Sequence, residues 1–259
     1  MTGSATAAPT GDRRAAPWTR AVLAQARVEL SLTLRRGESL LLTLGIPVLL
    51  LAFFSVVDVL PLPEGTEDAI DFLAPGILAL AVMSTAMVSL GIATGFERQY
   101  GVLKRLGVTP LGRRALLAAK TLAVLVIELV QVVVIGTVSW ALGWRPDGDV
   151  ALALAAALLA TVAFAGIGLL MAGTLRGEVT LAAANGLYLV LLLLGGMVFP
   201  LDRLPGALRA VAELLPAAAL SSALDAALTT GSAPGKAWAV LAVWALAAPA
   251  AAAATFRWE

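Results

Sequence analysis

The sequence contains neither cysteine nor histidine. Without cysteine the chain can form no disulfide and offers no thiolate nucleophile, and without histidine it has no Ser-His or Cys-His catalytic pair. The nitrogen and sulfur ligands that zinc usually takes are missing for the same reason. We therefore expect no catalytic residues and no metal site.

Charged residues are also scarce, at 14% of the chain, and the net charge is only +1, so nothing suggests nucleic-acid binding. Hydrophobic residues make up 60% of 259, and the mean hydropathy is +0.92. One soluble core could not bury so much apolar surface, which predicts an integral membrane protein. Few Lys, Asn and Ile beside abundant Ala, Arg and Gly favour a GC-rich bacterial source, and hence the bacterial plasma membrane.

The long apolar runs predict an all-α fold with six transmembrane helices. About 20 mostly apolar residues are needed to cross roughly 30 Å of hydrocarbon in a helix. The segments that meet this length are 39–60, 74–96, 114–142, 150–174, 180–200 and 236–256. An even number of crossings places both termini on one side of the membrane.

The distribution of basic residues predicts which side that is, because Lys and Arg near helix ends are retained in the cytoplasm. Of the 18 Lys and Arg residues, 14 fall on the side of the termini. The four on the other side are Arg145, Arg203, Arg209 and Lys236. The segment 57–73 between the first two spans has acidic residues but no basic one, as expected of an outer loop. Both termini are therefore predicted to be cytoplasmic.

Three regions are distinguished along the chain. Residues 1–16 are small and polar, which predicts a disordered cytoplasmic tail. In 17–37, apolar residues from Val22 to Leu34 recur at helical spacing with arginines elsewhere on the helix, which predicts an amphipathic helix in the cytoplasmic interface. A soluble helix packed on a partner is the alternative. Residues 38–259 form the predicted six-span permease domain.

The segment between the fifth and sixth spans has an apolar helical pattern that Pro205 and Pro216 interrupt. Each piece is too short to cross a bilayer. We expect an outer re-entrant helical hairpin here, with an amphipathic surface loop as the alternative.

The segment 96–120, FERQYGVLKRLGVTPLGRRALLAAK, carries six Lys and Arg residues between the second and third spans. Gly101 loosens the backbone, and Gly107 is suited to end a short helix. Thr109 and Pro110 fit an N-cap followed by proline at the first helical position of the third span. The sequence therefore predicts a helix, a break and a second helix on the cytoplasmic side.

The short helix in this segment places Val102, Leu103 and Leu106 beside Lys104 and Arg105. We expect an apolar knuckle, ringed by positive charge, that faces the cytosol and fits a groove on a soluble partner. An ordinary positive-inside loop would explain the charges, but not the apolar residues.

Three motifs in order resemble those of ABC exporter permeases of the second type, including the daunorubicin-exporter type of membrane subunit. The run GVLKRLGVTPLGRRALLAAK resembles that family's Glu-Arg-x-x-Gly-Thr-Leu-x-x-Leu … Thr-Pro signature, with Val102 in place of Thr. DFLAPGILALAVMSTAM is similar to the Phe-Leu-x-Pro-Gly opening of span two, and GGMVFPLDRLPGALRAVAELLP to the Phe-Pro-x-x-x-Leu-Pro entry of the outer hairpin. The following PAAALSSALDAAL departs from the family's more polar and aromatic stretch.

The resemblance implies that the short cytoplasmic helix is a coupling helix that docks on a separate cytosolic ATP-binding subunit. The residues it places at that contact are Glu97, Arg98, Gly101, Leu103, Lys104, Arg105 and Leu106. Two such subunits, which bind ATP and Mg, would work with two copies of the permease. GSAPGKA at 231–237 is one residue too short for a Walker motif and lacks its Ser or Thr, so no ATP or other cofactor is expected in this chain.

Polar residues within the apolar runs are the remaining candidates. Glu128 and Gln131 share one face of the third span, and a mid-bilayer carboxylate costs roughly 2.5 to 3.5 kcal/mol unless it faces protein or water. With Asn185, Met197 and Phe199 of the fifth span they are predicted to lie in the translocation pathway or the dimer seam. An interhelical hydrogen bond is the alternative for Glu128, and helix packing for Asn185.

The predicted function is the membrane subunit of a homodimeric, ATP-driven exporter, surrounded by membrane lipids, that moves an amphipathic drug-like or lipid-like substrate out of the cytoplasm or the inner leaflet. Export of a lipid-linked glycan or another lipid is the alternative within this class. An ion-coupled secondary transporter that uses Glu128 and a scaffold without transport are the alternatives from other classes.

Overall fold

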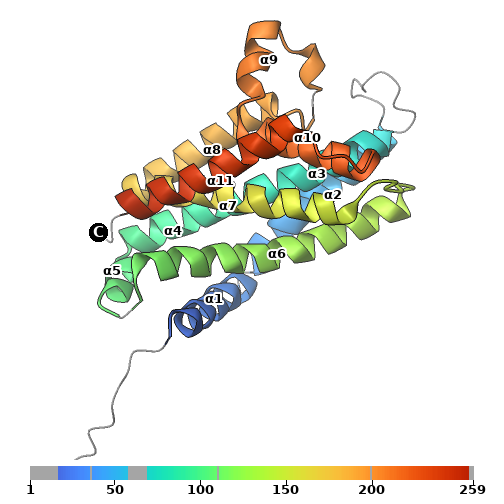
Figure 1. Ribbon diagram of the computed structural model, residues 1–259. Helices are drawn as coiled ribbons and strands as arrows, with labels where there is room; N and C mark the ends of the chain where they lie inside the picture. The colour runs from blue at the N-terminus through green and yellow to red at the C-terminus, as the bar shows by residue number, and fades with distance from the viewer. Residues whose placement is uncertain (1–16, 36, 58–68, 110, 199, 257–259) are drawn as a thin grey trace, which may run out of the picture.

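The computed structural model describes residues 17–35, 37–57, 69–109, 111–198 and 200–256. The predicted tail at 1–16 and Phe199 lie outside the described residues. All regular elements in the described part are helical (Figure 1). They are α1 (Trp18–Arg35), α2 (Gly37–Val56), α3 (Ala69–Met83), the π-helix η1 (Ser84–Ser89), α4 (Leu90–Gln99), α5 (Val102–Gly107), α6 (Arg113–Ala141), α7 (Val150–Thr174), α8 (Gly177–Leu194), the 3₁₀-helix η2 (Leu201–Arg203), α9 (Gly206–Ala212), α10 (Pro216–Thr229) and α11 (Gly235–Thr255).

Five helices in the described residues are long and apolar enough to cross a membrane: Ala69–Gln99, which joins α3, η1 and α4, then α6, α7, α8 and α11. They match the second to sixth predicted spans. The fifth ends at Leu194 instead of residue 200, because the chain turns at Gly196 with φ of +69°. A positive φ costs glycine little.

The helix predicted as the first span is α2, which has 20 residues. Its apolar stretch Thr43–Ser55 is shorter than the five spanning helices. A membrane crossing by α2 therefore stays a prediction. A further candidate for a sixth crossing is the pair α9 and α10, counted as one broken span.

The predicted interruption between the fifth and sixth spans is confirmed. Pro205 is the N-cap of α9 and Pro216 is the first residue of α10, and the two helices meet at an angle of 84°. α9 projects from the bundle, whereas α10 lies against α3, α7 and α11 (Figure 1). Such a bent pair is either a broken span or a re-entrant loop.

The centre of the bundle is α7, which contacts α3, α4, α6, α8, α10 and α11. Its small residues permit close packing. A Cβ atom at Gly168 would lie 2.6 Å from the carbonyl oxygen of Met87 in η1, and one at Gly166 would lie 2.5 Å from the nitrogen of Pro249 in α11. Small residues let helix backbones approach in this way within membranes. The tight centre therefore holds η1 of the long second span and α11 closely against α7.

The helix predicted at 17–37 is α1, which lies along α6 (Figure 1). Val22 and Ala26 are buried against Ala115 and Ala119 of α6, whereas Leu34 is 55% exposed. α5 and the last turn of α11 lie at one end of the bundle, and the connection between α6 and α7 lies at the other (Figure 1). The position of α1 in a membrane interface stays a prediction.

Candidate functional site

The elbow between α4 and α6, described at residues 100–109 and 111–112, contains the predicted break and short helix. Gly101 has φ of +72° and turns the chain between α4 and α5, and α5 ends at Gly107 as predicted. The predicted N-cap of the third span is wrong, because α6 begins at Arg113 with Gly112 as its N-cap, and Pro110 lies outside the described residues. Thr109 instead closes the end of α5 by donating its hydroxyl to the carbonyl oxygen of Leu106, 2.5 Å away.

The expected exposure of Leu103 is wrong, because the side chain is fully buried in the main core. A helix of six residues that rests on a bundle must turn one face inward, and Leu103 and the half-buried Leu106 lie on that face. Val102 is 42% exposed, and Lys104 and Arg105 are also exposed. Outside α5, Tyr100 and Val108 are exposed as well, at 71% and 86%. The elbow therefore presents apolar and basic side chains outward, while its leucines hold it to the bundle.

Arg98, which the motif places at the ATPase contact, is held by the bundle. Its Nη2 donates a hydrogen bond of 2.7 Å to the carbonyl oxygen of Leu175, the C-cap of α7. A cation at a helix C-terminus satisfies carbonyl groups that lack helical partners and interacts favourably with the helix dipole. Arg98 thus ties α4 to the end of α7.

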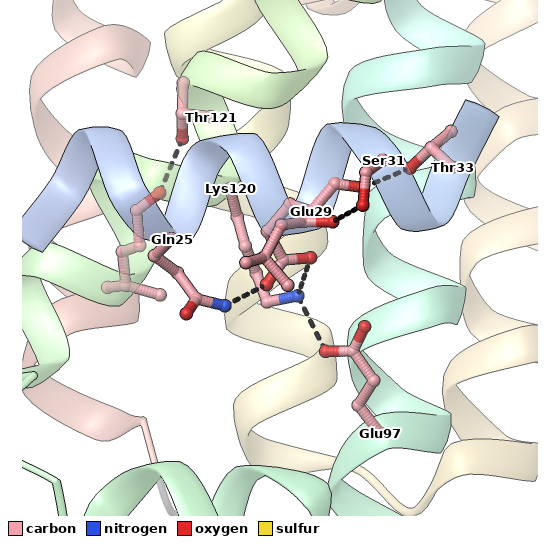
Figure 2. A network of polar contacts seen from close by, with 9 residues as sticks. Gln25, Glu29, Ser31, Thr33, Glu97, Lys120 and Thr121 are labelled. Carbon is pink, nitrogen blue, oxygen red and sulfur yellow. Dashed lines mark hydrogen bonds and ion pairs between the residues drawn. The ribbon is translucent and has the colours of Figure 1, made fainter. Parts of the chain in front are cut away.

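Glu97, which the resemblance places at the ATPase contact, belongs to an ion network around the buried Lys120 (Figure 2). Its Oε2 lies 2.6 Å from the Nζ of Lys120 in α6, and the same Nζ lies 2.9 Å from Oε2 of Glu29 in α1. Gln25 donates a hydrogen bond of 2.8 Å to the other oxygen of Glu29. Only 1% of the Lys120 side chain is exposed. One ammonium group therefore joins α1, α4 and α6.

Sequence reasoning did not assign a role to Glu29 or Lys120, although each is a charged residue within an apolar helical pattern. Lys120 is the eighth residue of α6, about 10 Å from the start of the helix and inside its apolar run. Glu29 follows Ala26 by three positions and Val22 by seven, which places a carboxylate on the buried face of α1. A charge on a buried face normally needs a partner, and this rule could have found both residues.

Beside this network lies a cleft of about 590 Å³ between α1, α2, α4 and α6, here called the lysine cleft. Glu29, Glu97 and Lys120 are the only charged residues among the described residues that line it. Its other walls are mainly apolar and include Val88, Phe96 and Ile127. The residue types around the cleft suit an amphipathic ligand with a charged group.

A second cleft of about 210 Å³, here called the Asn185 cleft, lies between α2, α3, η1 and α8. It shares Thr43, Val88 and Ser89 with the lysine cleft. The exposed Asn185 lines it, and the Asn185 amide nitrogen donates a hydrogen bond of 2.9 Å to the carbonyl oxygen of Leu181. Two of the shared residues belong to the π-helix, a rare element that is frequent at functional sites.

Glu128 and Gln131 are both buried and bind different neighbours. Thr161 of α7 donates its hydroxyl to Glu128. Gln131 accepts a hydrogen bond of 3.1 Å from the Thr85 hydroxyl and donates one of 3.1 Å to the carbonyl oxygen of Thr43. These contacts join different helices, and an interhelical hydrogen bond was the expected alternative to a pathway role for Glu128. Neither residue lines the lysine cleft or the Asn185 cleft, so their role in a pathway stays a prediction.

Met197 is also buried, and it packs within the protomer. A Cβ atom at Gly76 of α3 would lie 2.2 Å from the Met197 carbonyl oxygen, so the two backbones are in close contact. Ser221 of α10 donates a hydrogen bond of 3.0 Å to the carbonyl oxygen of Gly196. The turn after α8 is thus fixed to two helices.

Among the described residues, no group of three Asp or Glu side chains could hold a metal ion.

Comparison with known proteins adds two findings. The family model described as ABC-2 type transporter matches residues 20–228. The chain is also similar to two curated proteins, both called "Probable multidrug ABC transporter permease YbhS", from Escherichia coli K12 and Escherichia coli O157:H7. Each is 27% identical over 168 residues, which are 63% of this chain but only 44% of the relative. The aligned part thus spans less than half of these relatives.

Proposed function

The chain belongs to the ABC-2 type transporter family, and from this premise we propose that it is the membrane subunit of an ATP-driven exporter. Permeases of this family are multi-pass transport components in the membrane, and a separate subunit hydrolyses ATP. The substrate is an amphipathic drug-like or lipid-like molecule, taken from the cytoplasm or the inner leaflet. The protein is located in the bacterial plasma membrane, with both termini in the cytoplasm.

The observation that carries the proposal is the construction of the elbow. Its outward face offers Val102, Lys104 and Arg105 to a soluble subunit, while the buried Leu103 joins it to the core. A displacement of α5 is therefore passed to the bundle and is not absorbed by a loose loop. Two ATP-binding subunits, which hold ATP and Mg, dock here, one on each copy of the permease.

Closure of the ATP-binding subunits moves α5 as a lever. Because Glu97 at the end of α4 shares Lys120 with Glu29, this motion reaches α1 and α6 as well as the second span. The pathway then switches between inward and outward access, as packed helices do when they move between two discrete arrangements.

A second copy of this chain covers the exposed face of α8. Leu189 and Leu193 are 57% and 56% exposed on this helix, and the exposed Asn185 lies four residues before Leu189. Facing hydrocarbon, a polar amide is costly, whereas a facing helix or a water-filled path can satisfy it. We therefore place Asn185 at the dimer seam, where it borders the translocation pathway together with the Asn185 cleft.

The test is to purify the chain with its candidate ATP-binding subunit and reconstitute both in vesicles. A panel of amphipathic compounds is then screened for stimulation of ATP hydrolysis and for ATP-dependent movement. Lipid-linked glycans included in the panel test the alternative substrate class. Movement of cargo by vesicles that hold this chain alone would contradict the proposal.

An ion-coupled secondary transporter is the second candidate, and Glu128 is the observation that favours it. The carboxyl is buried, and its Oε1 has no hydrogen-bond partner among the described residues. Intramembrane carboxyl groups of this kind often act in proton relays. In that case an imposed pH gradient would drive transport without ATP, whereas the exporter requires hydrolysis under every gradient.

A further inference from the structure

The lysine cleft carries more negative than positive charge. Glu29 and Glu97 contribute two negative charges and Lys120 one positive charge, and the remaining described lining residues are uncharged. Lys120 directs its ammonium group at the two carboxylates, with 2.9 Å and 2.6 Å between the paired atoms. Its charge is thus already balanced, and one negative charge is left over.

The unbalanced negative charge can be assigned to Glu97, because one of its carboxylate oxygens is left to accept a further contact. One oxygen of Glu97 accepts from Lys120, and the other has no partner among the described residues, whereas both oxygens of Glu29 are bonded (Figure 2). Of the Glu97 side chain, 18% is exposed, so this carboxylate is partly shielded from water. Partial desolvation strengthens its attraction for a cation over that of a surface carboxylate.

Aromatic side chains stand beside Glu97. Phe96 and Tyr100 both line the cleft, and their rings are stacked with centroids 6.0 Å apart. The faces of such rings attract cations. Tyr100 is 71% exposed and Leu32 of α1 is 46% exposed, so the cleft opens between α1 and the end of α4.

We propose that the lysine cleft binds a lipophilic monocation, such as a drug-like ammonium or phosphonium compound, with its charge at Glu97 and its apolar body against η1 and α6. This names the substrate class of the proposed exporter and rests on that function only for its physiological meaning. The volume of about 590 Å³ lies within the range of roughly 300 to 1,000 Å³ that holds drug-sized ligands.

The Asn185 cleft extends the same site. Thr43, Val88 and Ser89 line both clefts, so the apolar body of a longer ligand can reach from Glu97 past the π-helix toward Asn185. A site inside one protomer thus leads to the face that we assign to the dimer seam. A neutral lipid or an anion gains nothing from Glu97, which separates these occupants from the one proposed.

The test measures binding to the permease alone, in nanodiscs of zwitterionic lipid, with empty nanodiscs to subtract partition. The probe is radiolabelled tetraphenylphosphonium, and its counterpart is tetraphenylborate, which has the same shape and the opposite charge. We expect saturable binding of the cation only. Equal saturable binding of both ions would overturn the proposal.

Variants locate the site. Glu97→Gln removes the spare charge and should weaken cation binding about tenfold, since an opposite charge at contact distance is lost from a partly desolvated site. Glu178→Gln, an equal charge change on the exposed first turn of α8, should leave binding unchanged.

The cleft can also be filled without a change of charge. Ala93→Phe places a ring inside it and should likewise weaken binding, whereas Ala254→Phe on the exposed surface of α11 should not. If both cleft variants bind the cation as their controls do, the site is refuted. The binding assay contains no ATP-binding subunit, so its result does not depend on whether the exporter proposal is correct. Equally, failure of cation binding would not contradict ATP-driven export of another substrate.

Discussion

The Nζ atom of Lys120 lies 2.6 Å from Oε2 of Glu97, although the two residues are 23 positions apart and belong to different helices. Glu29, 91 positions before Lys120, completes the contact. The two spans that the elbow joins are thus connected to each other and to α1 through one ammonium group. This connection yields a direct test of how the three helices are held together.

Lys120→Met should lower the free energy of unfolding by about 3 to 5 kcal/mol, because two partly buried carboxylates lose the buried cation that compensates them. Thermal unfolding in detergent measures the effect. Lys104→Met changes an exposed lysine of α5 and should stay within about 0.5 kcal/mol of the parent protein. Equal stability of both variants would contradict a structural role for the network.

Leu103→Ala should cost about 2 to 5 kcal/mol of stability, because it leaves a cavity under α5. Val102→Ala, one position earlier but exposed, should cost little. Comparison of the two melting temperatures checks the orientation of the short helix. If Val102→Ala proved the more harmful change, α5 would face the bundle with its other side.

Arg105→Glu should weaken association with the ATP-binding subunit by roughly 1 kcal/mol, or about fivefold, while the melting temperature stays unchanged. The exposed Arg203 near α9 provides the control, since Arg203→Glu makes the same charge change away from α5. Co-purification at several salt concentrations measures the effect. Equal recovery of the ATP-binding subunit with both variants would argue against docking at α5.

Glu128→Gln should fold normally, because the amide oxygen can still accept the hydrogen bond from Thr161. If Glu128 carries a proton during transport, the substitution will flatten the dependence of transport on pH. If it serves only as an interhelical acceptor, transport will follow the parent protein at every pH. Rates in vesicles between pH 6 and 8 distinguish the two roles.

Glu213, which follows α9, accepts hydrogen bonds from Arg209 and from Lys236 of α11. These hydrogen bonds and the attraction of both cations, that of Lys236 first, hold the pKa of Glu213 below its ordinary value. A lowered folded-state pKa gives stability that is present above the unfolded pKa of about 4.3 and lost as pH falls through the folded value.

The advantage of the parent protein over Glu213→Gln should therefore be present at neutral pH and disappear under acid conditions below the folded pKa. The advantage should also shrink at high salt, because Lys236 is exposed and Glu213 is only half-buried. Hydrogen exchange of α9 checks both effects. An advantage that persisted in acid would show that the side chain acts by packing and not by charge.

Much of the helical architecture followed from the sequence because it depends on neighbours along the chain. Five of the six expected spans appear as helices of sufficient length, and the prolines at 205 and 216 mark the starts of α9 and α10. The elbow was recognised from its glycines and basic residues. The orientation of Leu103 was missed, since composition does not say which face of a short helix meets the bundle.

The candidate site was only half predicted for a similar reason. Glu97 was named from a motif, but Lys120, which joins it to Glu29, lies 23 positions after Glu97 and 91 positions after Glu29, on a different helix from either. The length of an apolar run is a local property, so the sequence alone determined that this is a membrane protein with an all-helical bundle. Which charges meet, and where a cleft remains between them, depends on how the helices pack, and only the tertiary structure decided that.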